Sequence, residues 1–241
     1  MRLDVALVAR GLARSRNQAA ALIADGHVTV EGVVVRKASH VVGEDDAVHA
    51  QGGQWVSRAA HKLLGALDES GTDVPARVLD AGASTGGFTQ VCLSRGAERV
   101  YAVDVGHGQL APELREDPRV VVREGLNVRG ITLADVDDEP VDLVVGDLSF
   151  ISLRLVLMPL LAVCRGVALL LVKPQFEVGP GVTSGGIVTD PAARESAVSA
   201  VVEAAARSGW ACTWRGASPM PGQHGNVEYF VRLQPAPIAG Q

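Results

Sequence analysis

A glycine-rich turn between an apolar run and an expected helix is the part of the sequence best suited to bind a ligand. The run 77–80 ends in Asp80, and the turn A-G-A-S-T-G-G then leads into a helix expected from Phe88. Small residues let a backbone approach a ligand closely, and the amides at a helix start favour anionic or carboxylate groups. A phosphate loop would need Gly-Lys-Ser/Thr, and a dinucleotide fingerprint would need G-x-G-x-x-G, whereas this turn reads G-x-x-x-G-G. An ordinary α/β turn that binds nothing is the alternative.

The turn resembles the first motif of S-adenosylmethionine-dependent methyltransferases, whose cofactor carries no phosphate. Asp104 ends the next expected strand, the usual place for a carboxylate that accepts from ribose hydroxyls, and Asn127 follows the third, where it could hold the adenine side. Each is weak evidence alone, because polar residues are common after strands. The predicted cofactor-binding residues are Asp80, Gly82, Ala83, Ser84, Thr85, Gly86, Gly87, Phe88, Asp104, Asn127 and Asp147.

Three charged residues stand where an unpaired buried charge would be costly. Asp147 and Lys173 each end an apolar run, and Glu228 lies inside another, V-E-Y-F-V. A lysine directly after six apolar residues is seldom a random surface lysine. Lys62, on an expected helix, is a fourth candidate, although on its own it fits an exposed helix position equally well. Taken together, the four point to a functional site.

The composition places these residues in a globular protein. The chain has 241 residues, 47% of them hydrophobic, which suits one domain of ordinary size and a small second one. The longest fully apolar run, 167–172, is too short to cross a bilayer, and the N-terminus has no signal-peptide pattern. Three scattered cysteines and six histidines show no disulfide or metal-ligand spacing. We therefore expect a cytoplasmic protein with no membrane segment and no metal.

The first part of the chain carries a different charge from the rest. Residues 1–43 hold six Arg and Lys against three acids, which gives +3 and leaves −8 for the remainder of a chain whose net charge is −5. The strings R-L-D-x-x-L and S-R-x-x-A-x-x-L-I-x-x-G-x-V-x-V-x-G resemble the S-four RNA-binding domain. The alternative is a solvated arginine face. By that resemblance, the residues that face RNA phosphates are Arg2, Arg14, Ser15, Arg16 and Arg36 or Lys37.

The local patterns divide the chain into two domains. Helices are expected from Leu3 to near Gly11 and over 16–25, followed by a hairpin of strands 28–30 and 33–35 about Glu31-Gly32. A polar segment over about 44–56 reads as a linker. We therefore predict an RNA-binding α+β domain over 1–52 and a larger domain over 57–241.

The larger domain alternates apolar strand runs with helical segments. Continuously apolar runs are typical of parallel strands covered on both faces. The fold class expected is therefore α/β, a Rossmann-like, doubly wound, mostly parallel sheet of seven strands, with its last two strands pairing antiparallel. The Gly-rich stretch 178–186 could be a substrate lid or a disordered loop, and a late helix should open at Asp190-Pro191. The expected strands are 77–80, 99–104, 120–123, 141–147, 167–173, 211–215 and 228–233.

The order Lys62, Asp147, Lys173, Glu228 resembles the catalytic tetrad of FtsJ-like RNA 2′-O-methyltransferases. The strings S-R-A-A-H-K-L, D-A-G-A-S-T-G-G-F-T, G-D-L-S-F-I-S-L, K-P-Q-F-E-V-G and H-G-N-V-E-Y-F are similar to the TlyA, or haemolysin A, family. That family joins an S-four domain to an FtsJ-like methyltransferase. The resemblance covers essentially the whole chain and implies 2′-O-methylation of ribosomal RNA, with cytidine as target, S-adenosyl-L-methionine as cofactor, and ribosomal RNA or ribosomal subunits as partners. The rivals are a non-catalytic ribosome-binding assembly factor and a membrane-lytic haemolysin.

By the same resemblance Lys173 is the base for the ribose hydroxyl or the group that stabilises the forming alkoxide. An ordinary lysine titrates near pH ~10.4, so neutralising it at neutral pH costs about 4 kcal/mol. Neighbouring Asp147 and Glu228 would increase that cost, whereas Lys62 and desolvation would reduce it. Two hypotheses follow. Either Lys62 lowers the Lys173 pKa, or Lys173 stays charged and acts electrostatically.

Overall fold

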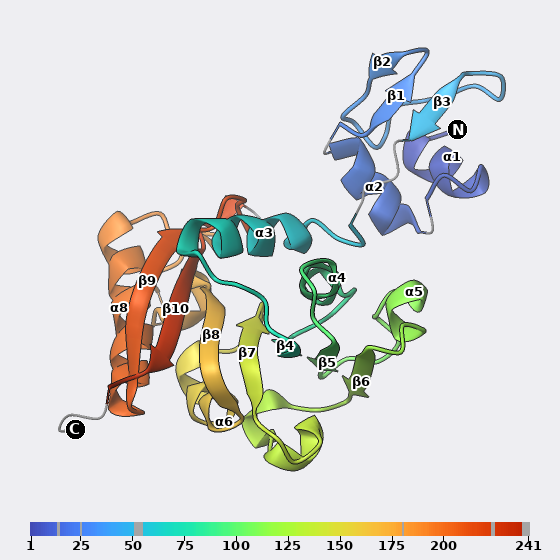
Figure 1. Ribbon diagram of the computed structural model, residues 1–241. Coiled ribbons are helices and arrows are strands. Elements are labelled where there is room, and N and C mark those ends of the chain that lie inside the picture. Colours follow the sequence, from blue (N-terminus) through green and yellow to red (C-terminus); the bar gives the residue numbers. More distant parts are fainter. Residues whose placement is uncertain (14, 25, 51–54, 180, 223–224, 238–241) are drawn as a thin grey trace. The chain divides into compact units, whose positions relative to one another are not determined.

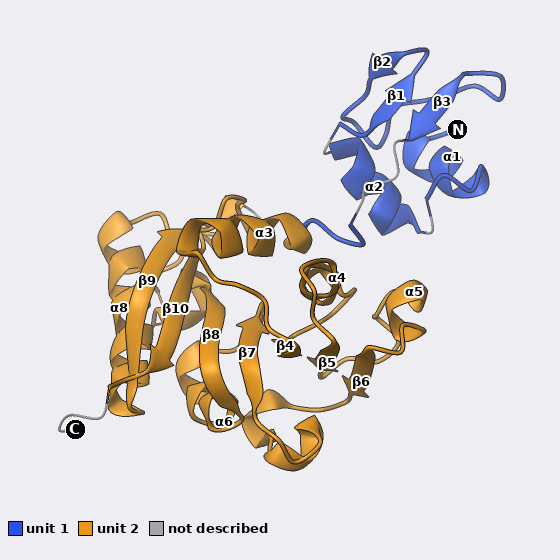
Figure 2. Ribbon diagram, in the orientation of Figure 1, with its two compact units in different colours: residues 1–58 blue, residues 59–241 orange. Residues whose placement is uncertain are grey.

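The computed structural model describes residues 1–241 except 14, 25, 51–54, 180, 223–224 and 238–241. The chain divides into two compact units, Met1–Arg58 and Ala59–Gln241 (Figure 2). Each unit has a hydrophobic core of its own.

The smaller unit is a pair of helices with a short antiparallel sheet. Helices α1 (Leu3–Ala9) and α2 (Arg16–Ala24) precede strands β1 (Val28–Val30) and β2 (Val33–Val34), as predicted. Glu31 and Gly32 have φ of 51° and 75°, the left-handed conformations that a two-residue hairpin turn requires. Leu3, Leu7 and Ile23 are fully buried and pack with β1 in the core of this unit.

The segment expected as a linker, 44–56, contains a strand. Residues Val48–Ala50 form β3, which pairs with β1 and completes the sheet order β2-β1-β3 in the described part of this unit. The segment before it is held by Arg10, whose guanidinium donates to the backbone oxygens of Gly43, Glu44 and Asp46 at 2.7, 3.0 and 2.7 Å. A three-residue strand inside a polar stretch gives little periodic signal in the sequence, whereas the structure shows it by its pairing with β1 and by Val48 in the core.

The larger unit confirms the predicted α/β class. Its described residues form a seven-stranded sheet of order β6-β5-β4-β7-β8-β10-β9, parallel except for β10, which runs antiparallel to both of its neighbours (Figure 1). The strands are β4 (Arg77–Ala81), β5 (Arg99–Asp104), β6 (Val120–Glu124), β7 (Val141–Gly146), β8 (Cys164–Val172), β9 (Trp210–Ala217) and β10 (Tyr229–Pro235).

The predicted strand limits are wrong at three informative places. Asp147, Lys173 and Glu228 each lie one residue outside the strand that was expected to contain them. In addition, β8 begins at Cys164 rather than at residue 167. Asp147 still donates its backbone N–H to Ala81 of β4, and Glu228 still accepts from the backbone N–H of Ser218 after β9, so the sheet continues to hold these backbones in place.

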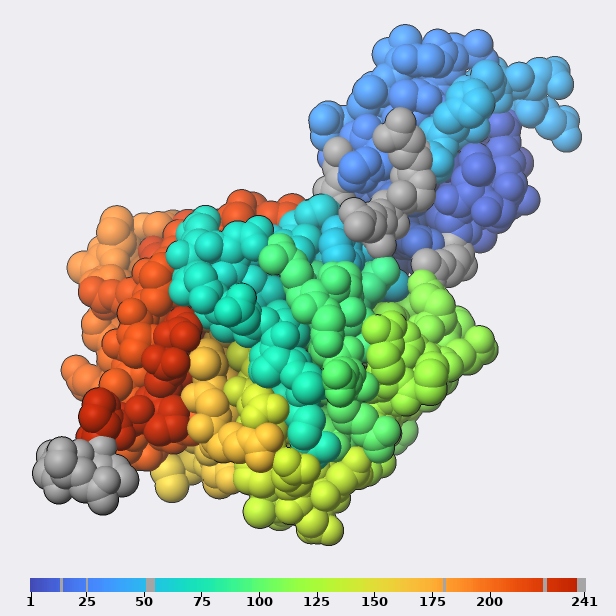
Figure 3. Space-filling model, viewed as in Figure 1, coloured from blue at the N-terminus to red at the C-terminus, as the bar shows by residue number. Residues whose placement is uncertain are grey.

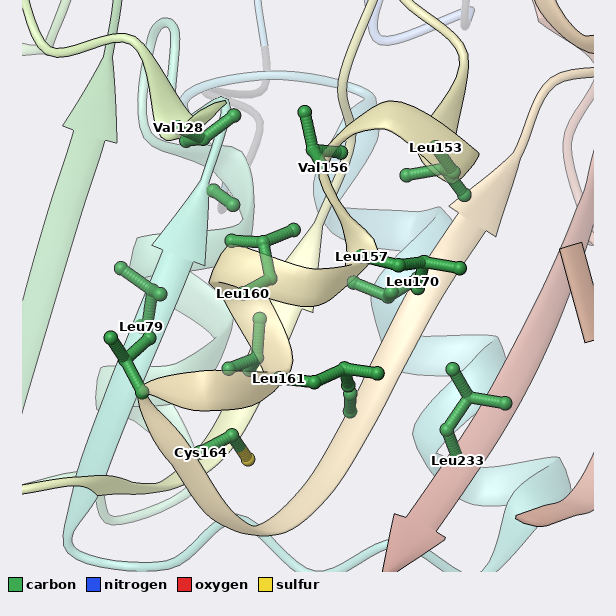
Figure 4. Close-up of a cluster of buried hydrophobic side chains, with 14 of the residues drawn as sticks. Leu79, Val128, Leu153, Val156, Leu157, Leu160, Leu161, Cys164, Leu170 and Leu233 are labelled. Carbon is green, nitrogen blue, oxygen red and sulfur yellow. The ribbon is translucent and has the colours of Figure 1, made fainter. Parts of the chain in front are cut away.

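Helices cover both faces of this sheet. On β8, Ala168, Leu170 and Val172 belong to one buried cluster, and the alternate residues Leu169 and Leu171 are buried outside it. That cluster also contains the leucines of α6, which lie on one side of Leu170 in Figure 4, together with residues of α8. On the opposite face Phe88 of α4 stacks on Phe230 of β10, with ring centroids 6.2 Å apart, and α3 packs beside α4 at the surface (Figure 3).

The helices begin and end where local chemistry dictates. Asp190 caps α8 by accepting from the backbone N–H of Ala192 at 2.9 Å, Pro191 holds the first helical position, and Gly209 follows the helix with φ 77°. This helix opens as predicted.

The helices of the unit are α3 (Ala59–Ser70), α4 (Gly87–Ser94), α5 (Pro112–Arg115), α6 (Leu157–Ala162), α7 (Pro174–Glu177) and α8 (Pro191–Arg207), with 3-10 turns η1 (Val128–Gly130), η2 (Leu133–Val136) and η3 (Leu153–Leu155).

Candidate active site

The glycine-rich turn follows β4 at the carboxyl edge of the sheet. Gly82 and Gly86 have φ of 85° and 95°, and Ser84 is left-handed as well, at 48°. A Cβ on Gly82 would lie 3.0 Å from the backbone oxygen of Asp147, and one on Gly86 would overlap the Leu114 side chain. The glycines are therefore needed both for the backbone conformation and for close packing, Gly82 against the residues that follow β7 and Gly86 against Leu110 and Leu114.

Asp80 lies beneath this turn and is fully buried. Its Oδ2 accepts a hydrogen bond from the Thr89 hydroxyl at 2.6 Å, whereas its Oδ1 has no hydrogen-bond partner among the described residues. Desolvation raises the pKa of Asp80 to about 7, against the opposing effect of the Thr89 hydrogen bonds. An unpaired carboxylate oxygen beneath a glycine turn suits a ligand that brings its own donor, such as the ammonium group of an amino acid.

The other predicted cofactor residues already have roles within the fold. Asp104 accepts from the backbone N–H groups of Ser84 and Gly106 at 2.8 and 2.7 Å, which ties the turns after β4 and β5 together. A carboxylate has about four acceptor positions, so Asp104 can still take ribose hydroxyls. Asn127 Oδ1 accepts from the Arg129 backbone N–H at 3.0 Å and caps η1, and the Phe88 ring is buried in the core. Their contacts with a cofactor stay predictions.

The four charged residues form two buried ion pairs. Lys62 Nζ donates to Glu228 Oε2 at 2.6 Å, and Lys173 Nζ lies 2.6 Å from Asp147 Oδ1. Exposed fractions of these side chains are 13% and 2% for the first pair and 10% and 17% for the second. Removing one partner of such a pair would leave a charge in a poorly solvated place.

The two pairs lie at neighbouring strand ends. Tyr229 of β10 pairs with Val172 of β8, so Glu228 and Lys173 each stand one residue beyond the same register pair. Gln175 strengthens the link, because its Nε2 lies 3.5 Å from Glu228 Oε1. The structure therefore gathers a helix residue and three strand-end residues that are far apart in sequence.

Ser149 and Phe150, which sequence reasoning did not assign, complete the surroundings of Lys173. Lys173 Nζ donates to the Ser149 hydroxyl at 2.7 Å. Phe150 is 87% exposed and has φ 62°, an unfavourable backbone conformation for a bulky residue, while its ring packs on Phe176 with centroids 5.3 Å apart. The string G-D-L-S-F-I-S-L shows that both residues follow β7, but nothing in it shows that the phenylalanine is exposed.

Glu177, also not assigned from the sequence, joins the loops that carry Asp147 and Lys173. Its buried carboxylate accepts from the Leu153 backbone N–H and the Ser152 hydroxyl, both at 2.6 Å, and from Arg154 Nε at 3.1 Å. Because Glu177 ends α7, which starts directly after Lys173, these bonds fix the loop after β7 against the segment after β8. Glu177 thereby helps to hold the two segments that carry Asp147 and Lys173 in fixed positions.

In the smaller unit, Arg2 and Arg16 converge on Asp4, a residue of the first turn of α1. Arg36 donates to the backbone oxygen of Ala24 at 2.9 Å. Ser15 Oγ accepts from the Gln18 backbone N–H at 3.2 Å, and Lys37 is exposed. Arg14 lies outside the described residues. In the described part of the chain no group of His, Cys, Asp and Glu side chains is arranged to hold a metal ion.

The strand order, the glycine turn after β4 and the polar strand ends define a Rossmann-like methyltransferase domain. Residues 55–234 match the FtsJ-like methyltransferase family, and residues 1–48 match the S4 domain. The chain belongs to the FtsJ-like methyltransferases and, among them, to the family that contains TlyA and hemolysin A.

Relatives that span both units support this assignment. The chain is 53% identical to the 16S/23S rRNA (cytidine-2′-O)-methyltransferase TlyA of Mycobacterium tuberculosis, over 97% of this chain and 89% of the relative. It is 38% identical to Hemolysin A of Brachyspira hyodysenteriae, over 97% and 99%. A solved structure of a candidate hemolysin from Streptococcus thermophilus has a TM-score of 0.78 at 35% identity, covering 98% of this chain and 88% of that one.

Proposed function

We propose that this protein is an S-adenosylmethionine-dependent methyltransferase that modifies the 2′-hydroxyl of cytidines in ribosomal RNA. The observation that carries the proposal is the pair of buried Lys–acid contacts at the edge of the sheet where β4 leads into the glycine turn. The name of the mycobacterial relative, at 53% identity, supplies the expected substrate.

The residues present fit the cofactor. The turn over 82–87 and Asp80 Oδ1 would hold its amino-acid part, Asp104 its ribose, and Asn127 its adenine side. When bound, the cofactor supplies an electrophilic methyl group.

Lys173 acts on the ribose hydroxyl. Ion pairing with Asp147 stabilises a positive charge on Nζ, so of the two hypotheses for Lys173 the geometry favours electrostatic action. A charged Nζ donates to the hydroxyl oxygen and stabilises the negative charge that develops on it, while the hydroxyl proton passes to solvent water. Ser149 and Asp147 orient that Nζ, and the Lys62–Glu228 pair fixes the neighbouring strand end.

Phe150 suits contact with an RNA base. Its ring is exposed, backed by Phe176, and lies one residue after the serine that binds Lys173. Exposed aromatic rings stack on unpaired RNA bases without requiring a particular base. In the proposal, Phe150 stacks on the target nucleotide or on its neighbour, residues 1–52 bind RNA through the S4 domain, and residues 57–241 carry the chemistry. In the proposal the enzyme works in the cytoplasm, together with its ribosomal substrate.

Mapping of ribose methylation tests the function directly. Ribosomal RNA from cells that carry the gene should show 2′-O-methylated cytidines that are absent without it and restored by the wild-type gene. Restoration by Lys173→Ala at the wild-type level would overturn the catalytic assignment. Binding of purified protein to ribosomal RNA without any methyl transfer would favour the non-catalytic assembly factor.

The haemolysin alternative has a separate test. Across the described residues, no helix combines the length and the apolar character needed to span a membrane. Leakage of dye from liposomes by the purified protein, undiminished in Lys173→Ala, would support a lytic activity separate from methylation.

A further inference from the structure

Two of the arginines in the smaller unit are held by one buried acid. Asp4 has 5% of its side chain exposed. Arg2 Nε donates to Asp4 Oδ1 at 2.9 Å, and Arg16 Nη2 donates to Asp4 Oδ2 at 3.0 Å. Since Arg2 precedes α1 and Arg16 opens α2, the carboxylate connects the starts of two helices.

Both guanidinium groups nevertheless stay open to solvent. The side chains of Arg2 and Arg16 are 50% and 64% exposed. Each guanidinium has five N–H donors, and Asp4 engages only the Nε and Nη2 atoms of each. The cluster therefore combines one buried negative charge with two exposed guanidinium groups, and hydrogen bonds to Asp4 fix the orientation of both.

We infer that Asp4 is a positioning residue for RNA, which orders Arg2 and Arg16 as a pair that engages phosphates. The inference rests on the proposed function, in which this unit binds ribosomal RNA. An arginine that is already ordered loses less side-chain entropy when it binds an anion, and the planar guanidinium needs a defined orientation to bind phosphate through two bonds. Arg10 makes the contrast within the same unit, because its donors go to backbone oxygens and hold the segment before β3.

Charge counting and positioning predict opposite effects of removing this acid. Deleting a negative charge close to RNA should strengthen binding if only net charge matters. Releasing two ordered arginines should weaken it. Asp4→Asn keeps the size of the side chain and one acceptor oxygen, so it is the mildest variant that separates the two predictions.

The experiment measures binding of the full chain to 23S ribosomal RNA transcribed in vitro, at one fixed salt concentration. We expect Asp4→Asn to bind about 5- to 30-fold more weakly than the wild type, from the ordering that two arginine side chains lose. In a chain that already carries Arg2→Ala and Arg16→Ala, adding Asp4→Asn should cause no further loss. Equal or tighter binding by the single variant, or an undiminished loss in the triple variant, would overturn the inference.

Arg16→Lys is a second variant that does not depend on the folding of Asp4→Asn. Lysine keeps the charge but cannot hold the carboxylate through two nitrogens, so positioning predicts a loss close to that of Arg16→Ala. Wild-type affinity of Arg16→Lys would count against positioning. A wild-type chain that neither binds nor methylates ribosomal RNA overturns the proposed function as well, whereas a wild type that does both while Asp4→Asn binds equally well overturns only this inference.

Discussion

The two buried Lys–acid pairs of the larger unit and the arginine cluster of the smaller unit both join basic to acidic side chains, but they differ in charge balance. In the larger unit each lysine has its own acid, and all four side chains are at most 17% exposed. In the smaller unit Asp4 serves two arginines that are half exposed or more. The first arrangement neutralises its charge internally, and the second leaves a net positive surface.

This difference in burial and charge balance suits the larger unit to chemistry and the smaller unit to binding. A buried, balanced pair has its geometry fixed by the protein, which suits a group that must meet one hydroxyl in one orientation. An exposed, unbalanced cluster attracts phosphate over a longer range, and its contribution depends on salt. Variants in the two regions should therefore affect different measurements.

The largest effect is expected at Lys173. Lys173→Ala removes the donor that we propose for the reacting oxygen and should lower the rate of methyl transfer roughly 10²- to 10⁴-fold, the range for loss of a positioned catalytic group. Single-turnover assays with saturating cofactor and RNA measure the change. Cofactor affinity by calorimetry should stay close to that of the wild type. A rate within threefold of the wild type would contradict the assignment of the chemistry to Lys173 in the larger unit.

Glu228→Gln tests whether the Lys62–Glu228 pair contributes to stability as a buried ion pair does. The variant leaves Lys62 without its counter-charge, and breaking a buried pair costs roughly 3–5 kcal/mol of stability. Denaturant unfolding measures the loss. In the matched double variant, Lys62→Met with Glu228→Gln, no uncompensated charge remains, so stability should recover although methylation should not. An unchanged midpoint in the single variant would show that solvent screens this pair, as at the surface.

Asp80 gives a pH dependence that the arginine cluster cannot give. Its pKa is raised to about 7 in the folded chain and is about 3.9 when unfolded, so the folded state binds more protons between these values. Stability should therefore fall as the pH rises from about 4 to about 7, by on the order of 4 kcal/mol from this group. Asp80→Asn should remove this dependence and be more stable than the wild type at neutral pH. Parallel curves for the two proteins would contradict it.

The dependence of stability on pH that comes from Asp4 has the opposite sign to that from Asp80. Hydrogen bonds from Arg2 and Arg16 lower its pKa to about 2, so its contribution is present above about pH 4 and is lost as the pH falls through 2. The pKa values of the two aspartates differ because their surroundings differ. Asp80 is isolated beneath the glycine turn, whereas Asp4 sits between two cations.

How much of this was predictable depends on the kind of signal. The seven strands of the larger unit and helix α8 could be predicted, because continuous apolar runs and a Pro after a cap residue are local patterns. Asp147, Lys173 and Glu228 could also be singled out, because a charge at the end of an apolar run or inside one is unusual, whereas Lys62 alone fits an exposed helix position equally well. The pairing of the four was not predictable, because it depends on β10 entering the sheet between β8 and β9. Strand β3, the exposure of Phe150 and the role of Glu177 leave no periodic trace in the sequence.

The smallest effect is expected at Phe150, whose uncharged, exposed ring is proposed to stack on an RNA base near Lys173. Phe150→Ala should weaken RNA binding about tenfold, within the 1–3 kcal/mol of one stacked base, and Phe150→Trp should largely restore it. The dependence of affinity on salt should not change, because no charge is removed. Arg16→Ala, in contrast, should reduce the slope of log affinity against log salt by about 1. If Phe150→Ala changed that slope, or Arg16→Ala did not, stacking at the active site and phosphate binding by the smaller unit could no longer be treated as separate contributions.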